Sequence, residues 1–103
     1  MSAFDYVIIG AGSAGCVLAN RLTANPKISV LLIEAGRKDT KPWIHIPGGY
    51  FKTMHNPKTD WCFKIQSDKG LGGREMNYPR GKTLGGSSSI NGLLYVRGQS
   101  QDY

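Results

Sequence analysis

A glycine-rich turn near the start of the chain constrains the fold more than any other feature. Residues 10–15 read G-x-G-x-x-G, with glycines at Gly10, Gly12 and Gly15. In this pattern the first glycine permits a tight turn out of a strand, and the second lets the backbone approach a pyrophosphate. The third lets the following helix pack against the strand. The hexapeptide alone is a weak signal, because a purely structural turn also uses glycine, so the flanking sequence decides.

The flanks on both sides fit a nucleotide-binding unit. Phe4 to Ile9 is a short, mostly apolar run that ends at a glycine, typical of a parallel strand buried on both faces. Apolar residues then recur at helical intervals from Ser13 to about Ala24, where Asn25-Pro26 ends the pattern. Ile28 to Ile33 is a second apolar run. We therefore predict a strand–helix–strand unit with parallel strands, whose first loop binds a pyrophosphate at the helix amino terminus.

An acidic residue follows the second predicted strand. Glu34 lies nineteen residues after Gly15, where a carboxylate is needed to bind a ribose hydroxyl. An acid here disfavours NADP, because its extra phosphate would face a second anion, but it does not separate NAD from FAD. The alternative is an ordinary solvated charge at a strand end.

The middle of the chain, from residue 37 to residue 78, has no sustained periodicity. Its first part predicts a loop with one helical turn. Trp61 to Gln66 and Glu75 to Tyr78 predict two short strands of a hairpin around a glycine-bearing turn at residues 68–73. Trp61 is a candidate for lining an adenine pocket, although a tryptophan in a short strand more often belongs to the core.

A second small-residue motif begins at Pro79. Gly85 and Gly86 are followed by three serines and Asn91, which gives little side-chain bulk and many hydrogen-bonding groups. The alternative is a flexible linker. The apolar residues around the motif argue against a linker, since linkers avoid apolar residues.

Together, the two motifs resemble those of the glucose-methanol-choline (GMC) oxidoreductases. The resemblance rests on residues 5–15 and 32–36 at the start and residues 79–92 near the end, and its closest form is the bacterial choline-dehydrogenase-like and alcohol dehydrogenases. It implies an α/β fold: the incomplete amino-terminal part of a Rossmann-like FAD-binding domain. The expected segments are a strand–helix–strand dinucleotide unit (1–36), a loop and hairpin region (37–78) and a second flavin-contacting motif (79–103), with the substrate domain absent.

The resemblance also implies which residues contact FAD. The expected contacts are Gly10, Ala11, Gly12, Ser13, Ala14, Gly15, Glu34, Ala35, Gly36, Arg80, Gly81, Thr83, Leu84, Gly85, Gly86, Ser87, Asn91, Gly92, Leu93 and Leu94. Some family members tether the flavin through a histidine just before the asparagine of the second motif. Ile90 stands there in this chain, so non-covalent FAD is expected.

The resemblance further implies hydride transfer from an alcohol to the flavin. In the family, a histidine and a partner that is histidine or asparagine take the proton from the alcohol. They lie near the carboxyl end of a much longer chain, and neither His45 nor His55 matches them. No catalytic residue and no metal ligand is therefore expected here, and the chain by itself is expected to be inactive. Two alternatives stay open: flavin-dependent lyase or photodecarboxylase chemistry on the same fold, and a non-catalytic nucleotide-binding fragment.

Charge and cysteine usage limit partners and location. Thirteen basic against seven acidic residues give a net charge of +6, but the basic residues are scattered and no nucleic-acid module accompanies them, so no nucleic-acid partner is expected. Cys16 and Cys62 are far apart in sequence, and Cys16 is expected to pack as a small apolar residue. With no leader or membrane-spanning run recognised, a cytoplasmic location is expected, with peripheral attachment to the inner membrane left open. The expected partners are a small alcohol and an unidentified electron acceptor.

Overall fold

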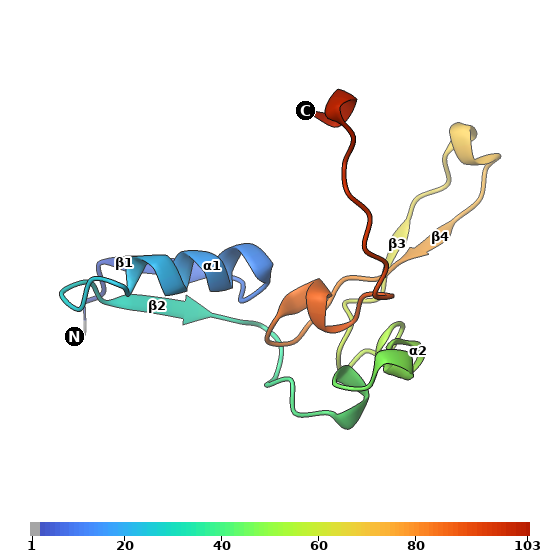
Figure 1. Cartoon of the computed structure of the whole chain (residues 1–103). Helices are drawn as coiled ribbons and strands as arrows, with labels where there is room; N and C mark the ends of the chain where they lie inside the picture. Colours follow the sequence, from blue (N-terminus) through green and yellow to red (C-terminus); the bar gives the residue numbers. More distant parts are fainter. Residues whose placement is uncertain (1–2) are drawn as a thin grey trace.

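The computed structural model describes residues 3–103 and begins with the predicted strand–helix–strand unit (Figure 1). Strand β1 (Tyr6–Ile9) leads through the glycine turn into helix α1 (Ser13–Leu22), and the chain returns as strand β2 (Val30–Ile33). The two strands are parallel, with Tyr6 opposite Val30 and Ile9 opposite Ile33. This part of the α/β prediction is confirmed.

The elements are shorter than the sequence pattern predicts. Helix α1 ends at Leu22. The Thr23 amide makes the last bond of α-helical spacing, to the Ala19 carbonyl, and the next amide, that of Ala24, bonds to the Arg21 carbonyl only three residues back. Strand pairing begins at Tyr6, opposite Val30. The preceding residue, Asp5, instead binds Ser29 through its side chain: its carboxylate accepts both the amide and the hydroxyl of Ser29. These hydrogen bonds, the backbone one foremost, lower the pKa of Asp5.

The glycine turn packs α1 tightly against β1. Gly10 has a φ of 95°, a conformation that a residue with a Cβ rarely adopts. At Gly15, a Cβ would lie 1.9 Å from the Gly10 carbonyl oxygen, so the helix reaches this position only with a hydrogen in place of a side chain. The mechanical roles predicted for these two glycines are confirmed.

The segment from residue 37 to residue 60 is a loop with short helical turns. These are η1 (Pro42–Ile44), η2 (Pro47–Gly49) and α2 (Tyr50–Thr53), where a single turn was predicted. Proline occupies the first position of η1 and of η2, where its fixed φ suits a helix and its missing N–H costs nothing. Two prolines thus account for the additional turns.

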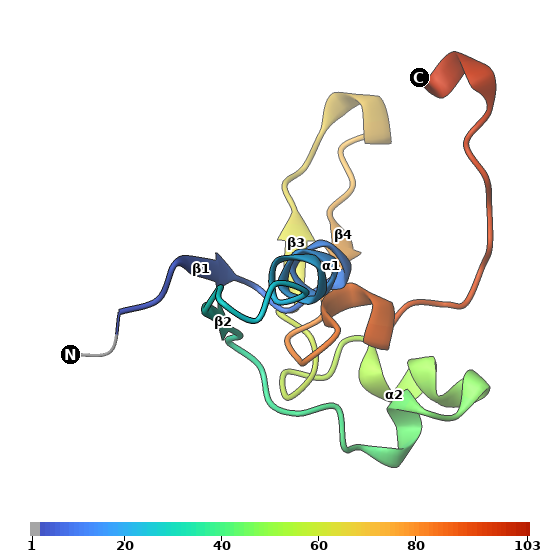
Figure 2. The ribbon, with the colours of Figure 1, turned by 60° about the vertical axis from the view of Figure 1, so that its left-hand side comes forward.

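The predicted hairpin follows. Strands β3 (Phe63–Ile65) and β4 (Met76–Tyr78) pair antiparallel, with Phe63 opposite Tyr78. The connection contains η3 (Lys69–Leu71), whose first turn is capped because the Asp68 carboxylate accepts the Gly70 amide at 2.6 Å. The hairpin extends away from the rest of the chain (Figure 2).

The last segment contains η4 (Gly86–Ser89) and η5 (Ser100–Asp102), joined by an extended stretch. The described chain is open: its radius of gyration is 16.9 Å, against about 13 Å for a compact domain of this length. Ala11 and Ile90 are the buried apolar residues of the described part. Leu94, in the extended stretch, is 90% exposed.

Two expectations about burial are wrong for the described chain. Strand β1 is not buried on both faces, and Ile9 is 86% exposed, because the two-stranded sheet carries one helix and no further strand beside it. Cys16 is exposed and does not pack as a core residue. Its neighbour Gly15 occupies the side of α1 that meets the sheet.

Candidate functional site

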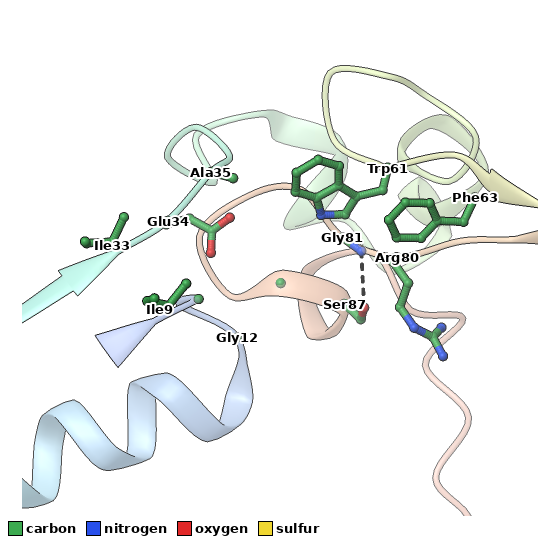
Figure 3. A pocket seen from close by; sticks show the side chains of 12 residues that line it. Ile9, Gly12, Ile33, Glu34, Ala35, Trp61, Phe63, Arg80, Gly81 and Ser87 are labelled. Atoms are coloured by element: carbon green, nitrogen blue, oxygen red, sulfur yellow. Dashed lines mark hydrogen bonds between the residues drawn. The ribbon is translucent and has the colours of Figure 1, made fainter. Parts of the chain in front are cut away.

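A groove of about 540 Å³ lies where the strand–helix–strand unit meets the hairpin and the second motif (Figure 3). The residues that line it come from both sequence motifs, from β3 and from the residues just before β3; they are Ile9, Gly10, Gly12, Ile33, Glu34, Ala35, Trp61, Phe63, Arg80, Gly81, Gly86 and Ser87. The carboxyl ends of both parallel strands open into it, which is where ligands bind in open α/β sheets.

The first wall of the groove is the amino terminus of α1. The Cys16 amide makes the first helical hydrogen bond, to the Gly12 carbonyl at 2.9 Å, so the preceding first-turn amides have no intrahelical acceptor. A Cβ placed on Gly12 would meet no atom within 4 Å, so the space in front of this glycine is open. An anionic group can therefore approach the backbone here.

Glu34 connects the end of β2 to the glycine turn. Its Oε2 accepts the Ala11 amide at 2.8 Å, and its Oε1 accepts the Gly36 amide at 2.8 Å. A carboxylate has about four acceptor sites, so acceptor capacity remains toward the groove that Glu34 lines. The predicted ribose contact does not account for these two bonds, which give Glu34 a second task in shaping the turn.

The two motifs are in direct backbone contact. We call this contact the seam: residues 11–12 lie against residues 85–86, and residues 36–37 lie against residues 82–84. The Gly85 amide donates to the Ala11 carbonyl at 2.8 Å, and the buried Thr83 hydroxyl donates to the Arg37 carbonyl at 2.9 Å. A Cβ on Gly36 would lie 2.1 Å from the Lys82 carbonyl carbon, and a Cβ on Gly86 would lie 2.9 Å from the Gly12 Cα. The motifs are thus adjacent in space although about seventy residues separate Gly12 from Gly86.

The opposite wall is aromatic and cationic. The rings of Trp61 and Phe63 are stacked, with centroids 5.9 Å apart and planes 3° from parallel. The Arg80 guanidinium lies 3.9 Å from the centre of the Tyr78 ring, and the Lys82 ammonium lies 4.4 Å from the centre of the Trp61 ring. In Figure 3 Trp61, Phe63 and Arg80 lie across the groove from Glu34 and Gly12. Flat apolar surface and positive charge are therefore combined on this wall.

Asp60 lies directly behind that wall and is 1% exposed. Its Oδ1 accepts the amides of Cys62 and Arg80, each at 2.9 Å, and its Oδ2 accepts the His55 amide at 2.7 Å. Burial raises the pKa of Asp60, whereas the hydrogen bonds from these amides lower it. The lowering is the larger effect, so the pKa of Asp60 is below its ordinary value.

The structure gathers part of the predicted contact set in the groove. The predicted residues that line it are Gly10, Gly12, Glu34, Ala35, Arg80, Gly81, Gly86 and Ser87. The glycine turn and the seam, which lie behind the groove, contain Ala11, Gly15, Gly36, Thr83 and Gly85. Helix α1 begins with Ser13 and Ala14. The other predicted contacts are exposed and do not line the groove; they are Leu84, Asn91, Gly92, Leu93 and Leu94. Their contact with a flavin stays a prediction.

Several lining residues were not predicted from the sequence. Ile9 and Ile33 are the last residues of their strands, and this position relative to the glycine turn was the available signal. For Phe63 the available signal was its position two residues after Trp61, because alternate residues of a strand lie on the same face. Trp61, a candidate for an adenine pocket, does line the groove and is 43% exposed.

Residues 3–103 contain neither a metal-ligand cluster nor a membrane-spanning helix. No group of three or more histidine, cysteine, aspartate or glutamate side chains converges in a way that would hold a metal ion. None of the helices in the described part is both long and apolar enough to cross a bilayer.

The fold and the groove define a dinucleotide-binding unit: parallel strands, a glycine turn at a helix amino terminus, and an acidic residue after the second strand. Comparison with known proteins identifies the family. The family model described as GMC oxidoreductase matches residues 4–103, so the chain belongs to the GMC oxidoreductase family. The resemblance seen in the sequence is confirmed, and FAD, the expected cofactor, is the cofactor of this family.

Relatives and solved structures agree with this assignment. The chain is 53% identical over 100 residues to an alcohol dehydrogenase [acceptor] of Pseudomonas putida, and 50% identical over 100 residues to an oxygen-dependent choline dehydrogenase of Photobacterium profundum. Each match covers 97% of this chain and 18% of the relative. The crystal structure of pyridoxine 4-oxidase from Mesorbium loti matches with a TM-score of 0.88 and 39% identity, over 97% of this chain and 19% of that one. The chain thus spans about a fifth of the length of these proteins.

Proposed function

We propose that this chain binds FAD for a flavin-dependent oxidoreductase that acts on the CH–OH group of an alcohol. The observation that carries the proposal is the groove itself. The glycine turn and Glu34 form one side, and the aromatic wall and the second motif form the other. The family assignment and the similarity to an alcohol dehydrogenase support the reaction class.

The donor set of the groove fits the parts of FAD. The free amides of α1 suit the pyrophosphate, and the positive charge of Arg80 supplements them. The remaining acceptor sites of Glu34 suit ribose hydroxyls, and the flat face of Trp61 suits an aromatic ring. We assign the residues of the second motif from Asn91 to Leu94 to contacts further along the cofactor, toward the flavin.

In this proposal the chain positions a cofactor that brings the redox chemistry. Bound FAD supplies an acceptor for the hydride that leaves the carbinol carbon. The residues of this chain bind and orient the cofactor, and no general base is assigned among them. Segment 1–36 acts as the dinucleotide unit, 37–78 as the aromatic wall, and 79–103 as the second cofactor-contacting motif. An alcohol and a separate electron acceptor are the proposed partners, and the cytoplasm is the proposed location.

The test is the flavin spectrum of the purified full-length protein. We expect flavin absorption that an alcohol substrate bleaches in the absence of an electron acceptor. We also expect denaturation to release the flavin into the soluble fraction, since Ile90 offers no atom for a covalent tether. A protein that binds NAD and ignores FAD would contradict the proposal. Bound flavin that no alcohol bleaches would instead favour lyase or decarboxylase chemistry.

Replacing Gly12 with alanine is expected to weaken FAD binding without unfolding the protein. The new methyl group meets no protein atom, and Gly12 has a φ of −79°, which alanine adopts freely. The methyl group does enter the space where a pyrophosphate would approach the backbone. We expect the FAD dissociation constant to rise about tenfold or more, which corresponds to about 1.4 kcal/mol. Titration of the flavin-free protein with FAD measures it.

The matched control for this variant is Gly48→Ala. Gly48 also has open space around its Cβ position, but it lies in η2, outside the groove. Both variants should have urea unfolding midpoints close to that of the wild type. An unchanged FAD affinity in Gly12→Ala would show that the cofactor does not approach this part of the backbone.

A further inference from the structure

The aromatic wall of the groove depends on backbone conformations that are rare for residues with side chains. Among residues 3–103, the non-glycine residues with positive φ are His55, Cys62 and Leu93, at 60°, 54° and 60°. A residue with a Cβ in this region is less stable than in ordinary backbone, because the Cβ lies too close to the following carbonyl. Such a conformation persists only where its surroundings hold it.

Two of these three residues share one hydrogen-bond acceptor. The amides of His55 and Cys62 both donate to the carboxylate of Asp60, one to each oxygen. Asp60 is nearly inaccessible to solvent, so these charged hydrogen bonds are not exchanged with water. A hydrogen bond to a charged group is stronger than one between neutral groups, so these two bonds offset the conformational cost at His55 and Cys62.

The third amide on Asp60 belongs to a residue of the groove. Arg80 donates its amide to Oδ1 of Asp60, and its carbonyl accepts the Trp61 amide at 2.8 Å. On the other side of this pairing, the Lys82 amide donates to the Thr59 carbonyl at 2.8 Å. Asp60 therefore fixes the start of the second motif against the segment that carries Trp61.

The strained residue Cys62 lies between the two aromatic residues of the wall. Its φ determines how the chain passes from Trp61 to Phe63, whose stacked rings both line the groove. None of the atoms of Asp60 lines the groove. Its influence on a ligand must act through the positions of Trp61, Phe63 and Arg80.

We propose that Asp60 is a positioning residue of the cofactor site, which holds the aromatic wall and Arg80 in their binding arrangement before the cofactor arrives. The inference rests on the proposed FAD function. It adds a residue outside both glycine motifs whose role is to pre-form one wall. A pre-formed wall removes the cost of ordering it on binding, so its loss appears as weaker affinity in a protein that remains folded.

Asp60→Asn in the full-length protein tests this role. The amide group that replaces one carboxylate oxygen directs N–H donors at a backbone N–H, so at least one of the three amides loses its acceptor. We expect the FAD dissociation constant to rise at least tenfold, measured at a temperature where urea titration shows the flavin-free variant to be folded. The visible circular dichroism of the bound flavin should change as well, because the chiral surroundings of the cofactor shift.

Asp68→Asn is the matched control. Asp68 is also an aspartate that accepts a backbone amide, but it is exposed at the tip of the hairpin, outside the groove. Its FAD affinity and flavin spectrum should match those of the wild type. If Asp60→Asn binds FAD within twofold of Asp68→Asn, the positioning role is overturned. If the wild type itself does not bind FAD, the proposed function fails instead.

Two additional measurements separate positioning from general stabilisation. Adding Cys62→Gly to Asp60→Asn should recover part of the lost affinity, because glycine adopts a φ of 54° without the penalty; no recovery would contradict the role given to Cys62. Hydrogen exchange on the wild type covers the case in which Asp60→Asn does not fold. Peptides spanning residues 54–63 should exchange slowly even without FAD, and fast exchange there would overturn a pre-formed wall.

Discussion

Gly15→Ala is expected to abolish stable FAD binding and to lower the free energy of unfolding by about 3 kcal/mol. The new Cβ would lie 1.9 Å from the Gly10 carbonyl oxygen and 3.1 Å from its carbon. Because these atoms are backbone, the overlap is relieved only by moving α1 away from the glycine turn. That movement displaces the first-turn amides from the groove. Urea unfolding and FAD titration of the full-length protein measure the two effects.

The comparison variant for Gly15→Ala is Gly48→Ala, which adds the same methyl group where no atom lies within 4 Å. The two variants change intrinsic backbone preference in a similar way, so the difference between them isolates the contact with Gly10. A Gly15→Ala protein with wild-type stability and affinity would show that α1 can shift at little cost.

Glu34→Ala is expected to reduce FAD affinity about 100-fold. The change removes the acceptor of the Ala11 amide and that of the Gly36 amide, and also the proposed partner of a ribose hydroxyl. Both bonds exist without the cofactor, so their loss lowers the free energy of unfolding, by about 1.5 kcal/mol each. The affinity falls because the glycine turn is no longer pre-formed and the ribose loses its partner, and 100-fold corresponds to about 2.7 kcal/mol. Titration with FAD measures the loss.

Glu75→Ala serves as the control for Glu34→Ala, because Glu75 is an exposed glutamate of the hairpin segment that does not line the groove. It should leave the FAD affinity unchanged. Glu34→Gln, which keeps one carbonyl oxygen, should fall between the wild type and Glu34→Ala. If Glu34→Ala retained FAD within threefold of the wild type, Glu34 would have neither the shaping role nor the ribose role.

The sequence predicted those features that follow from local patterns. The apolar residues form a continuous run, then recur at helical spacing, then form a second run, and this pattern marked β1, α1 and β2. The spacing of the glycines placed the first motif between β1 and α1. The hairpin followed from two short strand-like segments on either side of a glycine-bearing turn, and its antiparallel pairing is confirmed. These signals are local because each depends on neighbouring residues of one element.

The remaining features depend on contacts between distant residues. Asp60 has no motif around it, and its importance follows from the positive φ of His55 and Cys62, which a sequence does not display. The shaping role of Glu34 depends on where Ala11 lies relative to β2. Burial of β1 was mispredicted because a pattern of apolar residues shows which faces can be covered but not what covers them within the chain.

The seam between the two motifs bears on attempts to redesign the coenzyme preference. At Gly36 and Gly86 main chain rests directly on main chain, so any larger residue forces the two segments apart. These positions offer an engineer no room for new recognition groups. A library aimed at a different nucleotide should therefore leave the seam unaltered and vary the flanks that project side chains, such as Ala35, Trp61 and Ser87.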